Sequence, residues 1–384
     1  MKTVNMILFA ILLTIIAGCQ GGKKQSADNL VTVDVNKSYP EKELKLQDFM
    51  DVEYVPLEST DDFITRGIVK AIGKNVILTT NGGSDGDIFF FDRSTGKGIR
   101  KINRKGQSGE EYTQVTEVVL DEDNNEMFIN DYPARKIMVY DLYGNFKRGF
   151  SFIDTSYYLF IFNYDQNNLI GYRSYLPLVE NEQSEHILIS KKTGKITKEI
   201  KISTEKIVTP VITEGEASIT PSFNFIIPYQ GNWVFARASS DTIYNYINGD
   251  MSPIIVRTPS IHSMDSQIFL FPGTITDCYY FMYTQKKEFN LEAMKGFPTT
   301  DLVYDKQENA IFKCIVNNDD YSNKQQVSLS LKPISQEIAY CQSLEAPNLI
   351  EDNEEGHLKG KLKEVVAQLN EDSNPVIMLA KYKK

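Results

Sequence analysis

The sequence is poor in the residues that catalysis and metal binding use most. Of its 384 residues, three are histidine, four are cysteine and one is tryptophan. The histidines are His186, His262 and His357, and no two of them have the spacing of a metal-binding pair. No Ser-His-Asp or Cys-His arrangement, phosphate-binding glycine loop or dinucleotide fingerprint is present. The sequence therefore predicts no catalytic residues, no metal site and no cofactor.

The cysteines are too few for a disulfide framework. Cys19 falls in the N-terminal segment, which leaves Cys278, Cys314 and Cys341 for the folded part. Their spacing matches no zinc motif. One disulfide is possible in an oxidising compartment, but we favour the alternative that these are buried, small apolar side chains.

Positive charge is also in short supply. The chain has 41 Lys and Arg against 51 Asp and Glu, a formal net charge of −10. Removing residues 1–18 takes away one charge, that of Lys2, and makes the net charge −11. An acidic surface disfavours nucleic acid and anionic lipid as partners, and otherwise serves solubility.

The N-terminal apolar run is too short to span a bilayer. It follows Lys2, covers residues 6–16, and has the length of a signal-peptide core. It ends in Ile16-Ala17-Gly18-Cys19, which resembles the lipobox of bacterial lipoproteins. That resemblance implies cleavage before Cys19 and lipid attachment to it, whereas the alternative is an ordinary signal peptide with an incidental cysteine. We expect a signal peptide at 1–18, a flexible tether at 19–29 and a folded domain at 30–384.

The rest of the chain alternates short apolar runs with polar turns. Between residues 99 and 150, three runs rich in Val, Ile, Phe and Tyr are separated by turns such as Asp123-Asn124-Asn125 and Tyr143-Gly144-Asn145. Such runs are strand and hairpin signals. The stretch has the pattern of one blade of a β-propeller.

Related patterns recur along the chain. Phe91-Asp92, Tyr140-Asp141 and Ile189-Ser190 lie 49 residues apart, and each is followed by a glycine suited to a hairpin turn. Six units of roughly fifty residues fit six four-stranded antiparallel blades, an all-β six-bladed propeller. The turns that define the units are at residues 74–75, 124–125, 167–168, 231–232, 277–278 and 336–337.

The last unit has to close the ring. We expect its strands at residues 327–331 and 338–343, a helical insert near 354–369, and a final strand at 376–382. An N-terminal strand, either residues 30–35 or residues 52–57, is expected to complete this blade and cover its open edge.

Four stretches carry a family resemblance: Glu53 to Glu58, Gly106 to Tyr112, Tyr140 to Gly144 and Asn374 to Leu379. With them the chain resembles the six-bladed β-propeller lipoproteins of Bacteroidetes, a group related to NHL-repeat propellers. The loop at 106–112 departs from the family's glycine- and proline-rich pattern at residues 108, 109 and 110. The resemblance implies the propeller architecture and an envelope location, and no established catalytic residues.

The resemblance also bears on location. Some lipoproteins of this group carry an acidic export signal after the lipidated cysteine, whereas Gly21-Gly22-Lys23-Lys24 stands here. We therefore expect an outer-membrane-anchored lipoprotein that faces the periplasm.

Candidate binding residues lie in the loop at 106–112. Glu110, Glu111 and Tyr112 are expected either to border a binding face or to form a turn that only links two blades. Two aromatic runs, residues 157–162 and 279–283, are expected to pack mainly between blades.

The sequence thus predicts a lipid-anchored, non-enzymatic binding module for a glycan, peptide or protein. The alternative is a calcium-dependent lactonase-type hydrolase with its metal on the propeller axis, held by Glu, Asn and Asp.

Overall fold

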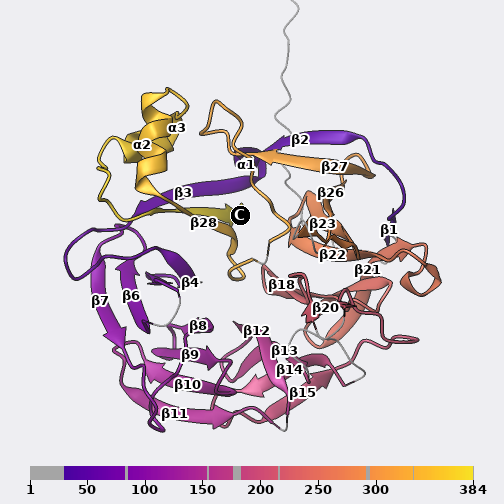
Figure 1. Ribbon diagram of the computed structural model, residues 1–384, viewed down its shortest axis with the longest axis horizontal. Coiled ribbons are helices and arrows are strands. Elements are labelled where there is room, and N and C mark those ends of the chain that lie inside the picture. The colour runs from indigo at the N-terminus through magenta and orange to yellow at the C-terminus, as the bar shows by residue number, and fades with distance from the viewer. Residues whose placement is uncertain are drawn as a thin grey trace, which may run out of the picture.

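The computed structural model describes residues 30–82, 85–153, 155–175, 183–214, 217–290, 295–331 and 333–383. Six β-sheets stand around a central axis as the blades of a propeller (Figure 1). The six-bladed, all-β fold predicted from the sequence is therefore confirmed. The signal peptide, Cys19 and the tether lie outside the described residues and stay predictions.

Each of the first three blades is one contiguous stretch of chain folded up and down into four antiparallel strands. The first blade consists of β4 (Ile68–Ile72), β5 (Val76–Thr80), β6 (Asp87–Asp92) and β7 (Gly98–Asn103). The second consists of β8 (Glu117–Asp121), β9 (Glu126–Asp131), β10 (Lys136–Asp141) and β11 (Phe146–Ser151). The third consists of β12 (Tyr157–Asn163), β13 (Asn168–Ser174), β14 (Glu185–Ser190) and β15 (Ile196–Ile200).

The repeated glycines turn the chain between the third and fourth strands of these blades. Gly96, Gly144 and Gly194 have φ values of 71°, 87° and 69°. An L side chain is strained in that left-handed region, so glycine is favoured at each turn. The recurrence seen in the sequence thus marks the same turn in three successive blades.

The fourth and fifth blades each gain a fifth, parallel strand from the N-terminal segment. The fourth consists of β18 (Ile226–Tyr229), β19 (Asn232–Phe235), β20 (Thr242–Ile247) and β21 (Asp250–Thr258), with β1 (Val31–Asp34) along β21. The fifth consists of β22 (Ile268–Ile275), β23 (Tyr279–Lys286), β26 (Thr299–Asp305) and β27 (Ala310–Asn317), with β2 (Glu41–Lys45) along β27.

The sixth blade joins the two ends of the chain and has three strands. They are β28 (Ile338–Leu344), β29 (Val376–Tyr382) and β3 (Met50–Pro56). Closure by an N-terminal strand is confirmed for the second of the two expected segments, because β3 pairs with β29, whereas β1 joins the fourth blade.

One strand expected in the last unit was wrong. Residues 327–331 form no strand but cross the inner strand of the fifth blade, where the Leu329 carbonyl accepts the Thr274 N–H at 2.8 Å. The apolar residues that suggested a strand, Val327 and Leu329, are buried there.

The helical insert is two helices and begins earlier than predicted. It consists of α2 (Ala346–Glu354) and α3 (Gly360–Val366), which lie outside β3 on the rim of the ring (Figure 1). Gly356, with a φ of 75°, lies between the two helices, and Gly360, with a φ of 59°, begins α3. Two shorter elements are α1 (Leu46–Phe49) and the 3₁₀ turn η1 (Ile261–Ser263). In the part of the chain that the structure describes, no helix is long and apolar enough to cross a membrane.

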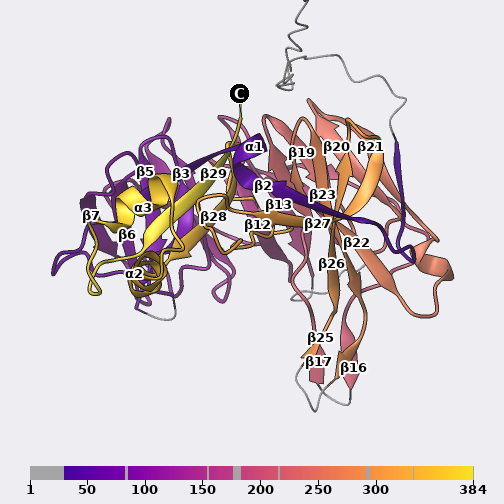
Figure 2. The same ribbon diagram turned by 90° about the horizontal axis from the view of Figure 1, so that it is seen from above.

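Two small hairpins distinguish the ends of the propeller. They are formed by β16 (Ile212–Glu214) with β17 (Ala217–Ile219), and by β24 (Phe289–Asn290) with β25 (Lys295–Gly296). Both project from the end opposite the C-terminus (Figure 2). The two ends of the ring therefore present different surfaces.

The core lies between successive blades. Phe90 of the first blade packs with Met127 and Ile129 of the second, and Phe128 of the second with Tyr158 of the third. The two aromatic runs are buried in this way for the most part, as predicted. Cys314 and Cys341 are free thiols, the former buried and the latter partly buried.

Candidate functional site

A depression of about 260 Å³ lies where the inner strands end around the propeller axis. The last residues of β4, β8 and β12 line it, together with residues of β18 and β19 and the segment 334–337 before β28. The Tyr382 N–H donates to the Glu337 carbonyl, so the depression lies at the end of the ring that holds the C-terminus. Four blades and one crossing segment thus contribute to one concavity.

The floor of the depression is apolar. Val118, Ile161 and Pro228 line it and are buried. Trp233 also lines it, but its indole is only 3% exposed and packs against Phe162. The inner strands supply these side chains because alternate residues of a strand point to the same side.

The rim is polar and tied together by charge. The Lys74 ammonium lies 2.8 Å from an Asp123 carboxylate oxygen, and Glu122 accepts the backbone N–H groups of Lys74 and Asn75. The hydrogen bond from Lys74 holds the pKa of Asp123 below its ordinary value. These contacts join the β4–β5 turn to the β8–β9 turn.

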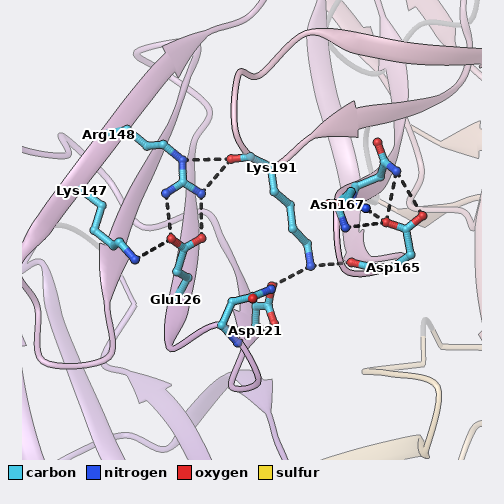
Figure 3. Close-up of polar contacts among 9 residues, drawn as sticks. Asp121, Glu126, Lys147, Arg148, Asp165, Asn167 and Lys191 are labelled. Carbon is cyan, nitrogen blue, oxygen red and sulfur yellow. Dashed lines mark hydrogen bonds and ion pairs between the residues drawn. The ribbon is translucent and has the colours of Figure 1, made fainter.

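A buried ion pair forms one side of the depression. Lys191, in the β14–β15 turn, donates from Nζ to Asp121 Oδ2 and to the Asp165 carbonyl, both at 2.6 Å (Figure 3). The side chains of Lys191 and Asp121 are 5% and 4% exposed. Because Asp121 ends β8, a residue of the third blade neutralises a carboxylate of the second blade beside the depression.

A second ionic contact joins the same two blades. Arg148, in β11, donates to both carboxylate oxygens of Glu126 at 2.7 and 2.6 Å and also to the Lys191 carbonyl (Figure 3). The Arg148 guanidinium, with the ammonium of Lys147, lowers the pKa of Glu126 to about 2. Glu126 is therefore held ionised and paired at the junction of the second and third blades.

The three candidate residues from the sequence lie at the opposite end of the ring. They belong to the loop between β7 and β8, and β8 runs from that loop to the depression. Glu110 is exposed, and its carbonyl accepts the Tyr140 hydroxyl at 2.7 Å. Glu111 accepts the Ser108 N–H at 2.8 Å, which lowers the pKa of its carboxyl.

Tyr112 is fully buried beneath that loop. Its hydroxyl donates to the Gly86 carbonyl at 2.6 Å and accepts the Arg104 N–H at 2.9 Å. Burial raises the pKa of Tyr112 to about 12. Tyr112 and Glu111 thus organise the loop, while a binding role for Glu110, Glu111 and Tyr112 stays a prediction.

The histidines do not form a site. His186 is buried between the rings of Tyr172 and Phe235, and His357 lies near Asp352 on the helical insert. Within the described ranges, no group of three or more His, Cys, Asp or Glu side chains could hold a metal ion.

Sequence reasoning missed the depression and its ion pair. Two signals were present: Asp121 lies two residues before the expected turn at Asp123-Asn124-Asn125, and Lys191 follows the recurring Ile189-Ser190 pair. That these two residues meet follows only from the packing of the second and third blades.

Comparison with known proteins supports the fold. A family model described as a domain of unknown function, DUF4934, matches residues 30–381. A Bacteroides fragilis protein described as exported has a similar structure, with a TM-score of 0.59 at 14% identity, over 92% of this chain and 100% of that one. A DUF4221 member from Bacteroides vulgatus has a TM-score of 0.47 at 11% identity, over 88% and 98%. Comparison with curated proteins gives no match.

Proposed function

The chain belongs to the DUF4934 family, and we propose that it is a non-enzymatic binding module that holds its ligand at the central depression. The observation that carries the proposal is the convergence of four blades on one concavity with an apolar floor and a polar rim. Ligand sites in proteins combine an apolar lining with a few placed polar groups, and propeller loops vary without disturbing the ring.

The ligand we propose is a glycan, peptide or protein rather than a small cofactor. At about 260 Å³ the depression fits one side chain or one sugar unit of a longer molecule. Its rim carboxylates are already engaged, Asp121 by Lys191 and Asp123 by Lys74. Glu122 and Glu337 also line the depression, so the rim keeps a small negative charge and suits a polar ligand better than an anionic one.

We propose that the module is anchored in the cell envelope through lipid on Cys19, with residues 20–29 as its tether. The lipobox-like sequence before Cys19 supports this, as does the description of the B. fragilis neighbour as exported. The resemblance to Bacteroidetes lipoproteins adds an outer-membrane, periplasm-facing location. Replacing Cys19 by Ala should release the protein from the membrane fraction, and unchanged membrane fractionation would contradict the anchor.

No observation favours the lactonase alternative. It needs Glu, Asn and Asp side chains that converge on the axis around a calcium ion. Near the axis, Asp121 is paired with Lys191, and Glu122 accepts two backbone N–H groups.

A pair of bulky substitutions tests the binding site. Asn163 is exposed and lines the depression, so Asn163→Trp should obstruct it without altering the core. Gln114 is exposed at the opposite end, and Gln114→Trp is the matched control. The probes are an array of envelope and plant polysaccharides and an array of synthetic peptides.

Binding that falls at least tenfold with Asn163→Trp and persists with Gln114→Trp supports the proposal. Binding that persists with Asn163→Trp and falls with Gln114→Trp would instead place the site at the opposite end of the ring, where Glu110 and Tyr112 lie. Failure of the wild-type protein to bind either array contradicts the binding-module function.

A further inference from the structure

Among the described residues, the sixth blade stands out because it is one strand short. Every other blade has four or five strands, whereas the sixth has β28, β29 and β3, with β3 outermost. The fourth and fifth blades have their outer edges covered by β1 and β2. The outer edge of β3 therefore coincides with the place of a fourth strand.

The register of β3 directs backbone groups toward that place. The Leu57 N–H donates to the Pro375 carbonyl, which fixes the pairs Val55–Ile377 and Glu53–Leu379 as the hydrogen-bonded pairs with β29. The N–H and C=O of Tyr54, between them, point away from β29. Pro56 also falls on the outward side, where a strand tolerates the lack of an N–H.

A cavity of about 780 Å³ adjoins this edge. Three consecutive residues, Glu53, Tyr54 and Val55, line it. Side chains of consecutive strand residues point to opposite sides, so three in a row can line one cavity only if the strand's edge faces it. Helix α3 forms the facing wall with Lys361, Glu364 and Val365.

The cavity occupies one part of the junction between the sixth and first blades. Between the first and second blades Arg100 donates to the Leu142 carbonyl, and between the second and third Arg148 donates to the Lys191 carbonyl. At the junction of the sixth and first blades, Arg93 lines the cavity and donates to a carbonyl of its own blade, that of Gly73. Next to Pro56 the first blade closes this junction, because the Glu58 N–H donates to the Gly96 carbonyl at 2.9 Å and Gly96 packs against the Pro56 carbonyl. The groove therefore runs along residues 53–55 of β3, between that strand edge and helix α3.

We propose that an extended peptide segment of a partner protein binds in this groove as the fourth strand of the sixth blade, paired with β3. Strand addition to a sheet edge is an established mode of peptide recognition, in which backbone hydrogen bonds supply affinity. The proposal deepens the binding function, on which it rests. Lys74 and Glu337 line both this groove and the central depression, so one peptide can occupy both.

The groove favours a peptide over the other occupants. Its walls carry charges of both signs, with Lys361 and Arg93 against Glu337 and Glu364, which suits a polar peptide of mixed charge. The aromatic residue of the wall, Tyr54, is partly buried and hydrogen-bonds Asn318 and Asp320, which leaves a poor platform for a sugar. A second copy of this chain, with a net charge of −10, would meet electrostatic repulsion.

The test begins with a phage-displayed library of twelve-residue peptides selected on the full folded domain. The strongest peptides are then synthesised with single N-methylated amides at each position. Strand pairing predicts that N-methylation weakens binding at least tenfold at alternate positions, because every second peptide N–H faces β3. A loss of affinity that does not alternate along the peptide overturns the proposal. Because only the peptide is modified, the protein stays unchanged in this experiment.

Two helix variants locate the peptide. Glu364→Trp fills the groove from an exposed position and should weaken binding at least tenfold. Lys363→Trp, also exposed and on the same helix but outside the groove lining, should leave the affinity within twofold. Amide exchange at Tyr54 should slow when peptide binds, whereas Glu53 and Val55 are already bonded to β29.

The outcomes separate this proposal from the binding function. Peptides that lose affinity with Asn163→Trp but not with Glu364→Trp would keep the central site and overturn strand addition. If the library yields no binding peptide but the protein binds a polysaccharide on the array, strand addition is overturned as well. A dimer in solution that Glu364→Trp dissociates would assign the edge to a second copy instead and overturn the peptide proposal.

Discussion

The first three blades and the last three are built in different ways. Blades one to three each use one contiguous stretch of the chain, between Ile68 and Ile200. Blades four to six each also take a strand from residues 31–56, so they contain contacts between positions more than two hundred residues apart. The first three blades are encoded locally, whereas the last three each include a strand from the N-terminal segment, and the sixth forms only when the two ends of the chain meet.

This difference also separates the regular blade junctions from the proposed peptide groove. Repeated turns and arginine contacts close the junctions of the first half. The departures from the repeat, namely the short sixth blade and its helical insert, surround the groove beside β3. Irregularity is where a repeat fold can acquire a binding surface without weakening its core.

The largest effect is expected from removing the last strand. Ending the chain after Asn374 deletes β29, whose residues 376–380 are at most 1% exposed. Burial of each large apolar side chain contributes about 1.5–3 kcal/mol to the free energy of unfolding. The summed loss is therefore comparable to the total stability of a typical domain, about 5–15 kcal/mol. We expect a protein without a cooperative thermal transition, and a truncated form that melts like the full chain would contradict ring closure by β29.

The next largest effect is expected at the junction of the second and third blades. Lys191→Met leaves the Asp121 carboxylate buried without its cation, which should cost about 3–5 kcal/mol of unfolding free energy. Denaturant unfolding measures the loss. The matched control combines Lys191→Met with Asp121→Leu and should recover most of it, because an apolar pair of similar size can replace a buried ion pair.

The boundary between the two halves should respond to pH. His186, in β14, donates from Nε2 to the Phe225 carbonyl at 3.0 Å, and burial lowers its pKa to about 4. Below pH 6.5 the imidazole of His186 binds a proton in the unfolded chain but not in the folded chain. The free energy of unfolding should therefore fall as pH drops toward 4, by at most about 3 kcal/mol. His186→Phe should remove this component, and an unchanged difference between the unfolding curves at pH 7 and pH 4.5 would contradict it.

The smallest effect is expected on the rim. Lys74 and Asp123 form an exposed ion pair, which water and salt screen. Lys74→Ala should leave the melting temperature unchanged within error. A marked drop would show that the rim contacts, and not the buried junctions, hold the first two blades together.

Much of the fold could be predicted because the signals are local. The turn glycines at 96, 144 and 194 and the strand patterns around them need only neighbouring residues. The segment at 327–331 was misread because its apolar residues are buried under a long crossing, a pattern that resembles a strand. The parallel strands β1 and β2 gave no local sign of their partners.

The candidate site was less predictable for the same reason. Glu110, Glu111 and Tyr112 were singled out as candidate binding residues, but their loop lies away from the depression. The Asp121–Lys191 pair joins residues 70 positions apart and depends on blade packing. Pro56 was the one local mark that β3 is an outer strand.

Amide hydrogen exchange of the sixth blade tests the central claim most directly. If the two ends of the chain close the ring, the bonded amides of β29 and those of Glu53 and Val55 should exchange only through global unfolding. Their protection should then equal that of β9, in the middle of the second blade. Exchange of β29 and β3 that is much faster than that of β9 would show that the first half stays folded with the ring open, and would contradict the account.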